Sequence, residues 1–142
     1  MVKWIYKNKS MEEIFKKFVA WTKIKIKIHL SARQIYFREG EIWWVNLGAN
    51  VGHEEEGKNE NFEHPVLILK KFNEFLLWAI PLSTKIKENN LYYYHYKLNG
   101  REYSAILPQF RVLSSKRLLR KIGMFPLLED YEKIREAIKK LI

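Results

Sequence analysis

The sequence contains no cysteine, so it can form neither a disulfide framework nor a thiolate metal site. Proline and glycine are scarce, with 4 and 6 residues, and no Gly/Ser-rich linker interrupts the chain. The longest unbroken apolar run, Phe75–Leu82, has eight residues, whereas a membrane-spanning helix needs about 20. The first ten residues lack the apolar stretch of a secretory signal peptide. These absences predict a soluble protein, and the lack of cysteine fits the reducing cytoplasm.

Acidic residues are outnumbered, since 26 Lys and Arg oppose 16 Asp and Glu and give a formal net charge of +10 at pH 7. The charge is unevenly distributed. Residues 1–40 carry ten basic and three acidic side chains, residues 41–64 carry one and six, and residues 65–142 carry fifteen and seven. A basic protein attracts polyanions by electrostatic steering and by counterion release. The composition therefore favours a nucleic acid or an acidic protein as the partner.

The chain is long enough for one domain with its own core, and 47% of its 142 residues are hydrophobic. Residues 1–37 are predicted to form a helical extension, because Ser10 and Glu13 have the spacing of a helix capping box. Five apolar residues follow at helical spacing: Ile14, Phe18, Trp21, Ile24 and Ile28. Residues 23–28 also alternate with the period of a strand, but the capping box and the longer stripe favour a helix.

From Glu41 onward, short apolar runs punctuated by turn residues replace the helical pattern. We expect strands at residues 41–47, 65–70, 75–81, 91–97, 104–107, 110–113 and 118–122, and a closing helix at residues 127–142. A polar loop, residues 48–64, separates the first two strands. Several strands at close spacing in a short chain indicate a small, strongly curved sheet or barrel.

Four segments in order along the chain carry the clearest functional signal. They are Arg38–Lys58 with its Gly-His-Glu loop, the strand that opens at Pro65, Ile80–Lys85, and Ser104–Arg111. Across residues 38–142 they resemble the MazF/PemK family, which includes Kid and comprises ribonuclease toxins of type II toxin–antitoxin pairs. The resemblance implies a mainly β, α+β fold. It would be a small SH3-like or CcdB-like barrel with a C-terminal helix, usually paired as a homodimer.

The resemblance also implies metal-independent cleavage of single-stranded RNA without a cofactor, and an acidic antitoxin as protein partner. Such cleavage needs a group that takes the proton from a 2′-hydroxyl, stabilisation of the phosphorane, and a proton for the leaving 5′-oxygen. Carried over by position, the catalytic hydroxyl is that of Ser83, with Thr84 beside it. The position of the catalytic arginine, which precedes a proline, is occupied by His64.

His64 changes what this position can do. Arginine offers a permanently charged planar set of donors that matches a phosphate, whereas histidine is shorter and only partly protonated near neutral pH. The chain could therefore be a slower enzyme, a silenced toxin, or an enzyme in which the imidazole acts as acid or base. A histidine that merely begins an edge strand is the structural alternative.

His53 and Glu54 lie where some family members have the same two residues. His53 is a candidate catalytic residue through contact with a phosphate, or else a loop histidine bonded to the backbone. Glu54 is expected among the RNA-binding residues, where it would orient a basic group, or else it shapes the loop. In the Kid branch the histidine acts with an Arg and an Asp, but Ile106 and Pro108 stand at those positions. Further RNA contacts are predicted for Lys85, Lys87, Gln109 and Arg111.

Two other functions compete with RNA cleavage. A catalytically inactive homologue would bind RNA or an antitoxin without turnover. A gyrase-directed toxin of the CcdB type shares the barrel, but its activity depends on a tail that ends in tryptophan, which residues 140–142 do not provide.

Overall fold

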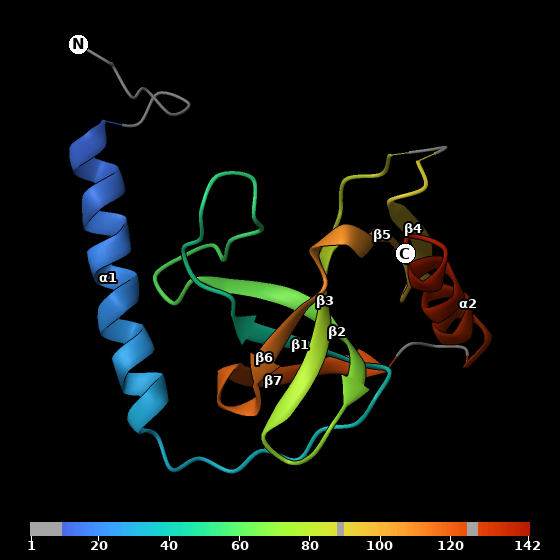
Figure 1. Cartoon of the computed structure of the whole chain (residues 1–142), viewed down its shortest axis with the longest axis horizontal. Coiled ribbons are helices and arrows are strands. Elements are labelled where there is room, and N and C mark those ends of the chain that lie inside the picture. The colour runs from blue at the N-terminus through green and yellow to red at the C-terminus, as the bar shows by residue number, and fades with distance from the viewer. Residues whose placement is uncertain (1–9, 88–89, 125–127) are drawn as a thin grey trace.

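The computed structural model describes residues 10–87, 90–124 and 128–142, and over these residues the chain combines helices with one antiparallel sheet (Figure 1). The elements are α1 (Met11–Leu30), β1 (Glu41–Asn46), β2 (Glu63–Lys71), β3 (Leu76–Ser83), β4 (Tyr93–Leu98), β5 (Arg101–Ile106), the 3-10 turn η1 (Leu107–Gln109), β6 (Arg111–Ser114), the 3-10 turn η2 (Ser115–Arg117), β7 (Leu118–Met124) and α2 (Leu128–Lys139). Every predicted strand overlaps an observed one, and the predicted α+β class is confirmed. Residue 127 of the predicted closing helix lies outside the described residues.

The sheet has the strand order β4-β5-β3-β2-β1-β7, and β6 pairs with the first part of β3 on the edge opposite β2. Strand β3 is the centre of the sheet because it pairs with β2 and β6 along its first part and with β5 at its end, where Ser83 lies opposite Ser104. Register shifts in the β1–β7 and β2–β3 pairs bend the sheet. The outer strands β4 and β7 do not pair, so the sheet is curved but is not the closed barrel that the resemblance implied.

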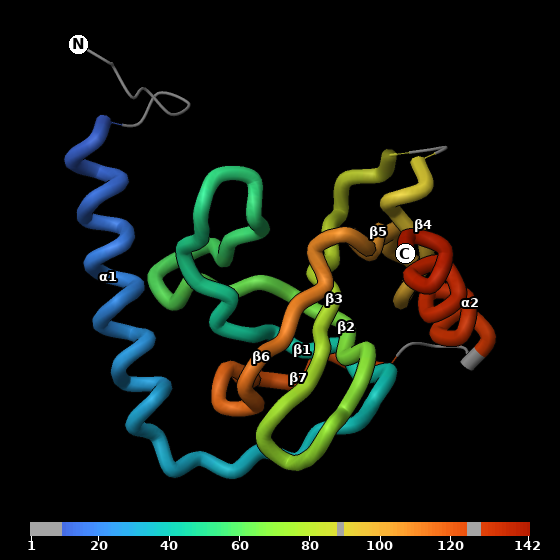
Figure 2. Tube along the Cα trace, in the orientation of Figure 1, coloured from blue at the N-terminus to red at the C-terminus, as the bar shows by residue number. Residues whose placement is uncertain are grey.

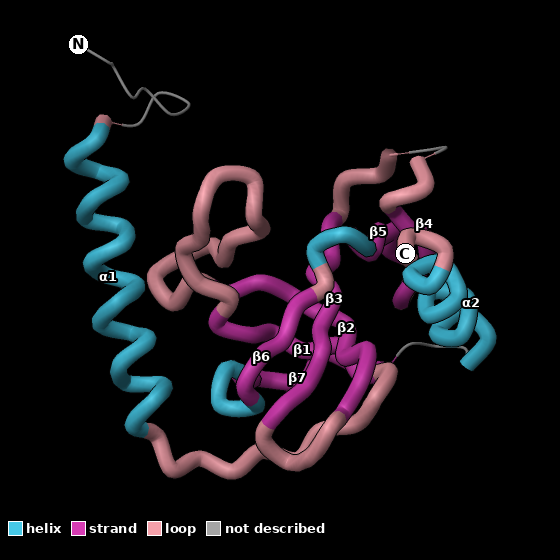
Figure 3. Tube along the Cα trace, in the orientation of Figure 1, coloured by secondary structure: helices cyan, strands magenta, loops and turns pink. Residues whose placement is uncertain are grey.

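Two cores lie on opposite faces of the sheet. Successive side chains of a strand point to opposite faces, so Ile80 of β3 packs in one core and Leu77 in the other. Helix α2 lies beside β4 (Figure 3) and covers the first core. Its Ile134 is fully buried. The hydroxyl of Tyr94 on β4 donates to Asp130 of α2 over 2.9 Å and holds the helix in place. The predicted C-terminal helix therefore packs over one of the two cores.

Helix α1 begins as predicted, with the Ser10 hydroxyl accepting a hydrogen bond from the backbone N–H of Glu13 over 3.2 Å. It continues through residues 23–28, so the helical interpretation of that segment is confirmed. Trp21 is its one buried residue, and Phe18 of the predicted apolar stripe is 37% exposed. The helix stands beside the β1–β2 connection rather than on the sheet (Figure 2). Neither described helix is long and apolar enough to cross a bilayer.

Candidate functional site

The β1–β2 connection, residues 48–62, forms a loop that is closed at its base. The backbone N–H of Leu47 donates to the carbonyl oxygen of Phe62 over 2.9 Å, and that of Gly57 donates to Gly48 over 2.8 Å. These bonds join the two ends of the loop, so the residues between them project from the sheet as a unit (Figure 3). The predicted residues His53 and Glu54 lie in this projecting part and are exposed.

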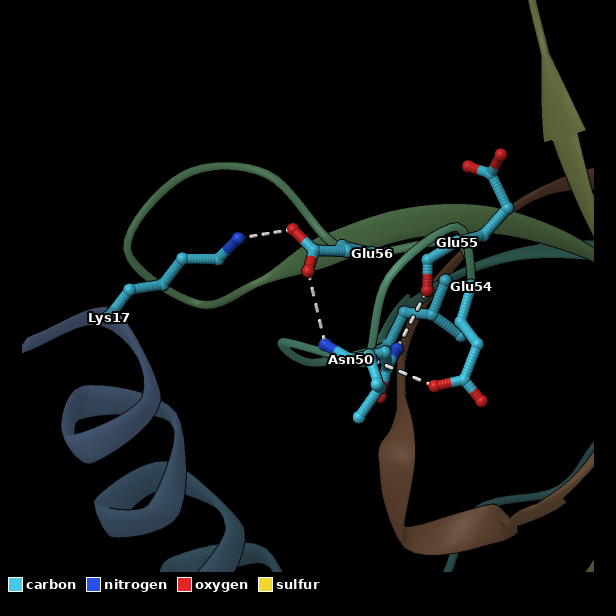
Figure 4. Close-up of polar contacts among 7 residues, drawn as sticks. Lys17, Asn50, Glu54, Glu55 and Glu56 are labelled. Carbon is cyan, nitrogen blue, oxygen red and sulfur yellow. Dashed lines mark hydrogen bonds and ion pairs between the residues drawn. The ribbon is translucent and has the colours of Figure 1, made fainter. Parts of the chain in front are cut away.

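Side chains of residues 50–56 hold the loop in shape. Glu54 accepts a hydrogen bond from the backbone N–H of Val51 over 2.8 Å, and Glu56 accepts one from that of Asn50 over 3.2 Å. The amide group of Asn50 also donates to the carbonyl oxygen of Glu55 over 2.7 Å (Figure 4). Of the two roles expected for Glu54, the geometry therefore supports shaping the loop.

Gln109 ties the loop to the end of the sheet. Its Nε2 donates to the carbonyl oxygen of His53 over 2.9 Å, and its Oε1 accepts from the backbone N–H of Glu55 over 3.2 Å. A glutamine amide has one donor group and one acceptor, and here both are used by the loop. Because η1 also contacts β3, this residue brings the loop next to the end of that strand.

His64 lies near the start of β2, beside the base of the loop, and is only 7% exposed. Its Nε2 lies 2.8 Å from the carbonyl oxygen of Leu82, which can only accept, so Nε2 carries the proton. Burial lowers the pKa of His64 below its usual value, and the charge of Glu55 opposes this only in part. The imidazole is therefore neutral at pH 7 and does not supply the charge that arginine would supply.

Ser83 follows Leu82 at the end of β3 and is half-buried. Its hydroxyl accepts a hydrogen bond from the backbone N–H of Lys85 over 3.1 Å, which turns the chain away from the sheet. The His64–Leu82 bond therefore brings the two positions with the strongest functional signal, 64 and 83, to neighbouring strand ends. Ser83 is half-buried at this strand end, whereas His64 is buried beside the base of the loop.

The second predicted hydroxyl, Thr84, and three of the predicted RNA contacts lie around this strand end at different depths. Thr84, Lys85 and Lys87 follow Ser83 and are exposed, and the Lys87 ammonium lies 5.2 Å from the centre of the Tyr93 ring. Arg111 is half-buried at the start of β6, paired with Ala79 four residues before Ser83. The lysines are thus free to meet a polyanion, and Arg111 lies deeper.

Helix α1 contacts the outer side of the loop through an ion pair. Lys17 forms an ion pair with Glu56, the carboxylate that also accepts from Asn50 (Figure 4). Both charged side chains are mostly covered, at 26% and 29% exposed. An ion pair that is shielded from water and continues into a hydrogen bond is worth more than an exposed pair. The first turns of α1 therefore act on the same loop that Gln109 holds from the other side.

Trp21 packs α1 against the base of the loop. Its ring lies 5.6 Å from that of Phe62, and the guanidinium of Arg117 lies 5.5 Å from its centre. Arg117 in turn donates to the carbonyl oxygens of Asn46 and Leu47 over 3.1 and 3.3 Å. Burial, with a smaller effect of the Arg111 charge, lowers the pKa of Arg117 to about 10.

A hollow of about 140 Å³ opens between α1 and η2. It is lined by Lys25, Ile28, His29, Ser114, Lys116 and Arg117. None of the residues predicted to act on RNA lines this hollow. Its positively charged lining forms because α1 packs next to η2, and the sequence alone could not show where α1 would pack.

Gly48→Ala is expected to displace α1 from the loop. Gly48 has φ +98°, and an added Cβ would lie 2.4 Å from the Trp21 ring. The left-handed backbone alone costs roughly 1–2 kcal/mol, and the clash adds to it. Gly40→Ala is the matched control, since Gly40 has φ +87° and nothing within 4 Å of the added Cβ. In thermal unfolding, Gly48→Ala should lower the stability clearly more than Gly40→Ala does. Equal losses of stability in the two variants would contradict the packing of Trp21 against the loop.

Stability is expected to fall in acid because of His64. The unfolded chain, with a histidine pKa near its usual 6.5, binds a proton more readily than the folded chain, so folding stability is lost as the pH falls below that value. Urea unfolding between about pH 8 and pH 5 should show a shallower decline for His64→Gln than for the unchanged chain. His95→Gln, at an exposed position on β4, is the control and should retain the original slope. A slope that His64→Gln leaves unchanged would contradict the buried neutral imidazole.

Comparison with known proteins places this geometry in a family. The sequence profile described as PemK-like, MazF-like toxin of type II toxin-antitoxin system matches residues 38–142. No curated protein sequence matches the chain. Among solved structures, MazF (Form-I) from Deinococcus radiodurans is similar with a TM-score of 0.57 and 17% identity, over 75% of this chain and 97% of that one. The Mycobacterium tuberculosis toxin MazF-mt6 is similar with a TM-score of 0.52 and 18% identity, over 70% and 93%.

The structural similarity supports the fold, and the profile match supports the family. The profile covers the whole sheet and α2, and it leaves α1 outside. The chain therefore belongs to the family of PemK-like, MazF-like toxins of type II toxin–antitoxin systems, whose members are endoribonucleases.

Proposed function

We propose that this chain is the toxin of a type II toxin–antitoxin pair and cleaves single-stranded messenger RNA at short sequences, without a metal ion. The observation that carries the proposal is the meeting of positions 64 and 83 at neighbouring strand ends, within a chain that belongs to this family. The net charge of +10 supports an RNA substrate. Since messenger RNA is the proposed substrate, we expect the protein to act in the cytoplasm.

In this proposal the 2′-hydroxyl of one nucleotide attacks the adjacent phosphorus and the bond to the 5′-oxygen breaks. The hydroxyl of Ser83, at a half-buried strand end, is the group that contacts the reacting phosphate, with the exposed Thr84 beside it. The exposed ammonium groups of Lys85 and Lys87 bind flanking phosphates, and Arg111 adds positive potential beneath them.

The two histidines have different parts. His53 is exposed on the loop and is the one that could exchange a proton with the RNA. His64 donates to a backbone carbonyl and would reach the RNA only after the loop moves. Gln109 uses both of its amide groups on the loop, so it is a positioning residue.

A cleavage assay with an end-labelled, unstructured RNA in EDTA tests the proposal. The unchanged chain should give fragments with a 2′,3′-cyclic phosphate and a 5′-hydroxyl. His64→Arg should raise the cleavage rate, because a permanent charge replaces a neutral ring, and should lower the melting temperature, because that charge is buried. If neither protein cuts RNA at any concentration, the catalytic proposal fails.

A non-catalytic toxin homologue is the second candidate, and one observation favours it. Position 64, where the family carries arginine, holds a buried neutral ring instead. Such a protein would bind RNA or an antitoxin without cutting RNA. RNA binding that persists without fragments, and that Ser83→Ala leaves unchanged, would select this candidate.

We also propose that the toxin is a homodimer and that an acidic, partly disordered antitoxin segment binds over its RNA site. The positive charge of the toxin predicts a complex that weakens as salt concentration rises. A complex that is insensitive to salt, or that leaves RNA binding intact, would contradict this arrangement.

A further inference from the structure

Helix α1 has two apolar faces, and only one of them is covered. The inner face carries Trp21 against the loop. The outer face carries five large apolar residues, which we call the outer stripe: Met11, Phe15, Val19, Ile26 and Leu30, exposed by 65%, 70%, 39%, 54% and 76%. With 3.6 residues per turn, these five lie within an arc of about 100° along the whole helix. Nothing in the described part of the chain covers this stripe.

A row of lysines borders the outer stripe on one side. Lys16, Lys23 and Lys27 lie within about 40° of one another by the same helical geometry, and all three are exposed. Lys16 pairs with Glu12 over 3.1 Å, whereas within the described residues no ion pair engages Lys23 or Lys27. We call these three residues the basic edge. An apolar stripe beside a row of like charges is the pattern of a surface that binds a helix of opposite charge.

We propose that the outer stripe and the basic edge form a docking surface for an acidic amphipathic helix of a partner protein. The stripe runs from Met11 to Leu30, which is about 28 Å at 1.5 Å per residue, so it accommodates about five turns of a partner helix. The apolar side of that helix covers the stripe, and its carboxylates reach Lys23 and Lys27. Contiguous exposed apolar surface with a polar border is typical of such interaction sites.

Charge decides between this partner and a second copy of the chain. Two copies of α1 packed along their outer stripes would bring basic edges together, and each α1 already has more lysines than carboxylates. A membrane surface is also disfavoured, because helices that lie on membranes have one strongly polar face and α1 has apolar residues on both sides.

The inference deepens the proposed function, since an acidic antitoxin is the partner proposed there. It adds a site that lies outside the residues shared with the toxin family, 38–142. Because α1 also grips the loop through Lys17, a partner on the outer stripe binds the same helix that orders the candidate site.

The test uses the full chain and a fluorescein-labelled helical peptide of about 20 residues, with leucine at the a and d heptad positions and glutamate elsewhere. Anisotropy titrations should show binding that weakens with salt. Phe15→Ser should weaken it about tenfold or more. Phe75→Ser, at the β2–β3 turn and 65% exposed, is the matched control and should leave it unchanged. The double change Lys23→Gln and Lys27→Gln should weaken binding several-fold and flatten its salt dependence.

Several results would overturn the docking surface. One is that the unchanged chain does not bind the peptide. Another is that Phe15→Ser does not weaken binding, and a third is that Phe75→Ser weakens binding as much as Phe15→Ser does. A dimer that sedimentation finds and Phe15→Ser dissociates, without peptide binding, would assign the stripe to a second copy. Binding to phosphatidylserine vesicles but not to the peptide would assign it to a membrane. Circular dichroism confirms that each variant is folded. RNA cleavage by the same protein is measured in parallel. If no RNA is cleaved, the proposed function is contradicted, but the result of the peptide titration is not affected.

Discussion

Ser83→Ala should reduce RNA cleavage by roughly 100-fold while changing RNA affinity little, because a group that acts on the reacting phosphate contributes mainly in the transition state. The Ser83 hydroxyl is half-buried at a strand end, and its one described partner is the backbone N–H of Lys85. Losing that single hydrogen bond costs about 1 kcal/mol of stability. Single-turnover cleavage at saturating protein, with a separate binding titration, measures the two effects.

Ser114→Ala is the matched control for this change. Ser114 also ends a strand, is half-buried, and accepts a hydrogen bond from the backbone N–H two residues later, over 3.2 Å. It should therefore lose a similar amount of stability and no cleavage. Equal effects of the two substitutions on cleavage would remove Ser83 from the catalytic proposal. A loss of RNA affinity in Ser83→Ala would assign the residue to binding instead.

Trp21→Ala should lower the free energy of unfolding by about 3 kcal/mol, at the lower end of the usual cost of truncating a buried tryptophan because the residue lies at the edge of the fold. The substitution removes the contacts with Phe62 and Arg117 and leaves α1 with no buried side chain. Hydrogen exchange should then rise in α1 and in residues 48–57.

Trp78→Ala is the control for this second result. Trp78 is 40% exposed on β3, where it contacts Phe72 and Phe110. Its truncation should cost less stability and should leave hydrogen exchange in the loop unchanged. If loop exchange were the same in all three proteins, α1 would not order the loop.

The strands could be predicted because their signal is local. Alternation on β3 sends Leu77 to one core and Ile80 to the other, and that period is visible in the sequence. Helix α1 was predictable for the same reason, since the Ser10 cap lies three residues from the group it binds. The sequence could not show that the sheet stays open. Closure into a barrel depends on the relative positions of β4 and β7, and these are set only after the six other strand pairs have formed.

The candidate site was predictable only in part. Position 83 was named from the family resemblance, and the lysines after it were named from their positive charge. The contacts of Gln109 with the loop were not predicted, because they join residues 54 and 56 positions apart. The burial of His64 depends on a loop that folds over it, and neither periodicity nor composition indicates where a polar loop will lie. Lys17 and Trp21 gave no functional signal because an amphipathic helix does not reveal what its covered side contacts.

The attachment of α1 has a consequence for the order in which a newly made chain acquires its structure. Lys17 leaves the ribosome 39 residues before Glu56, and His29 leaves it 87 residues before the Lys116 side chain that binds its carbonyl oxygen. Arg117, which stacks on Trp21, comes later still. Helix α1 is therefore synthesised before all of these partners, and its attachment can be complete only after Arg117 has left the ribosome. The loop would reach its final arrangement no earlier than that point.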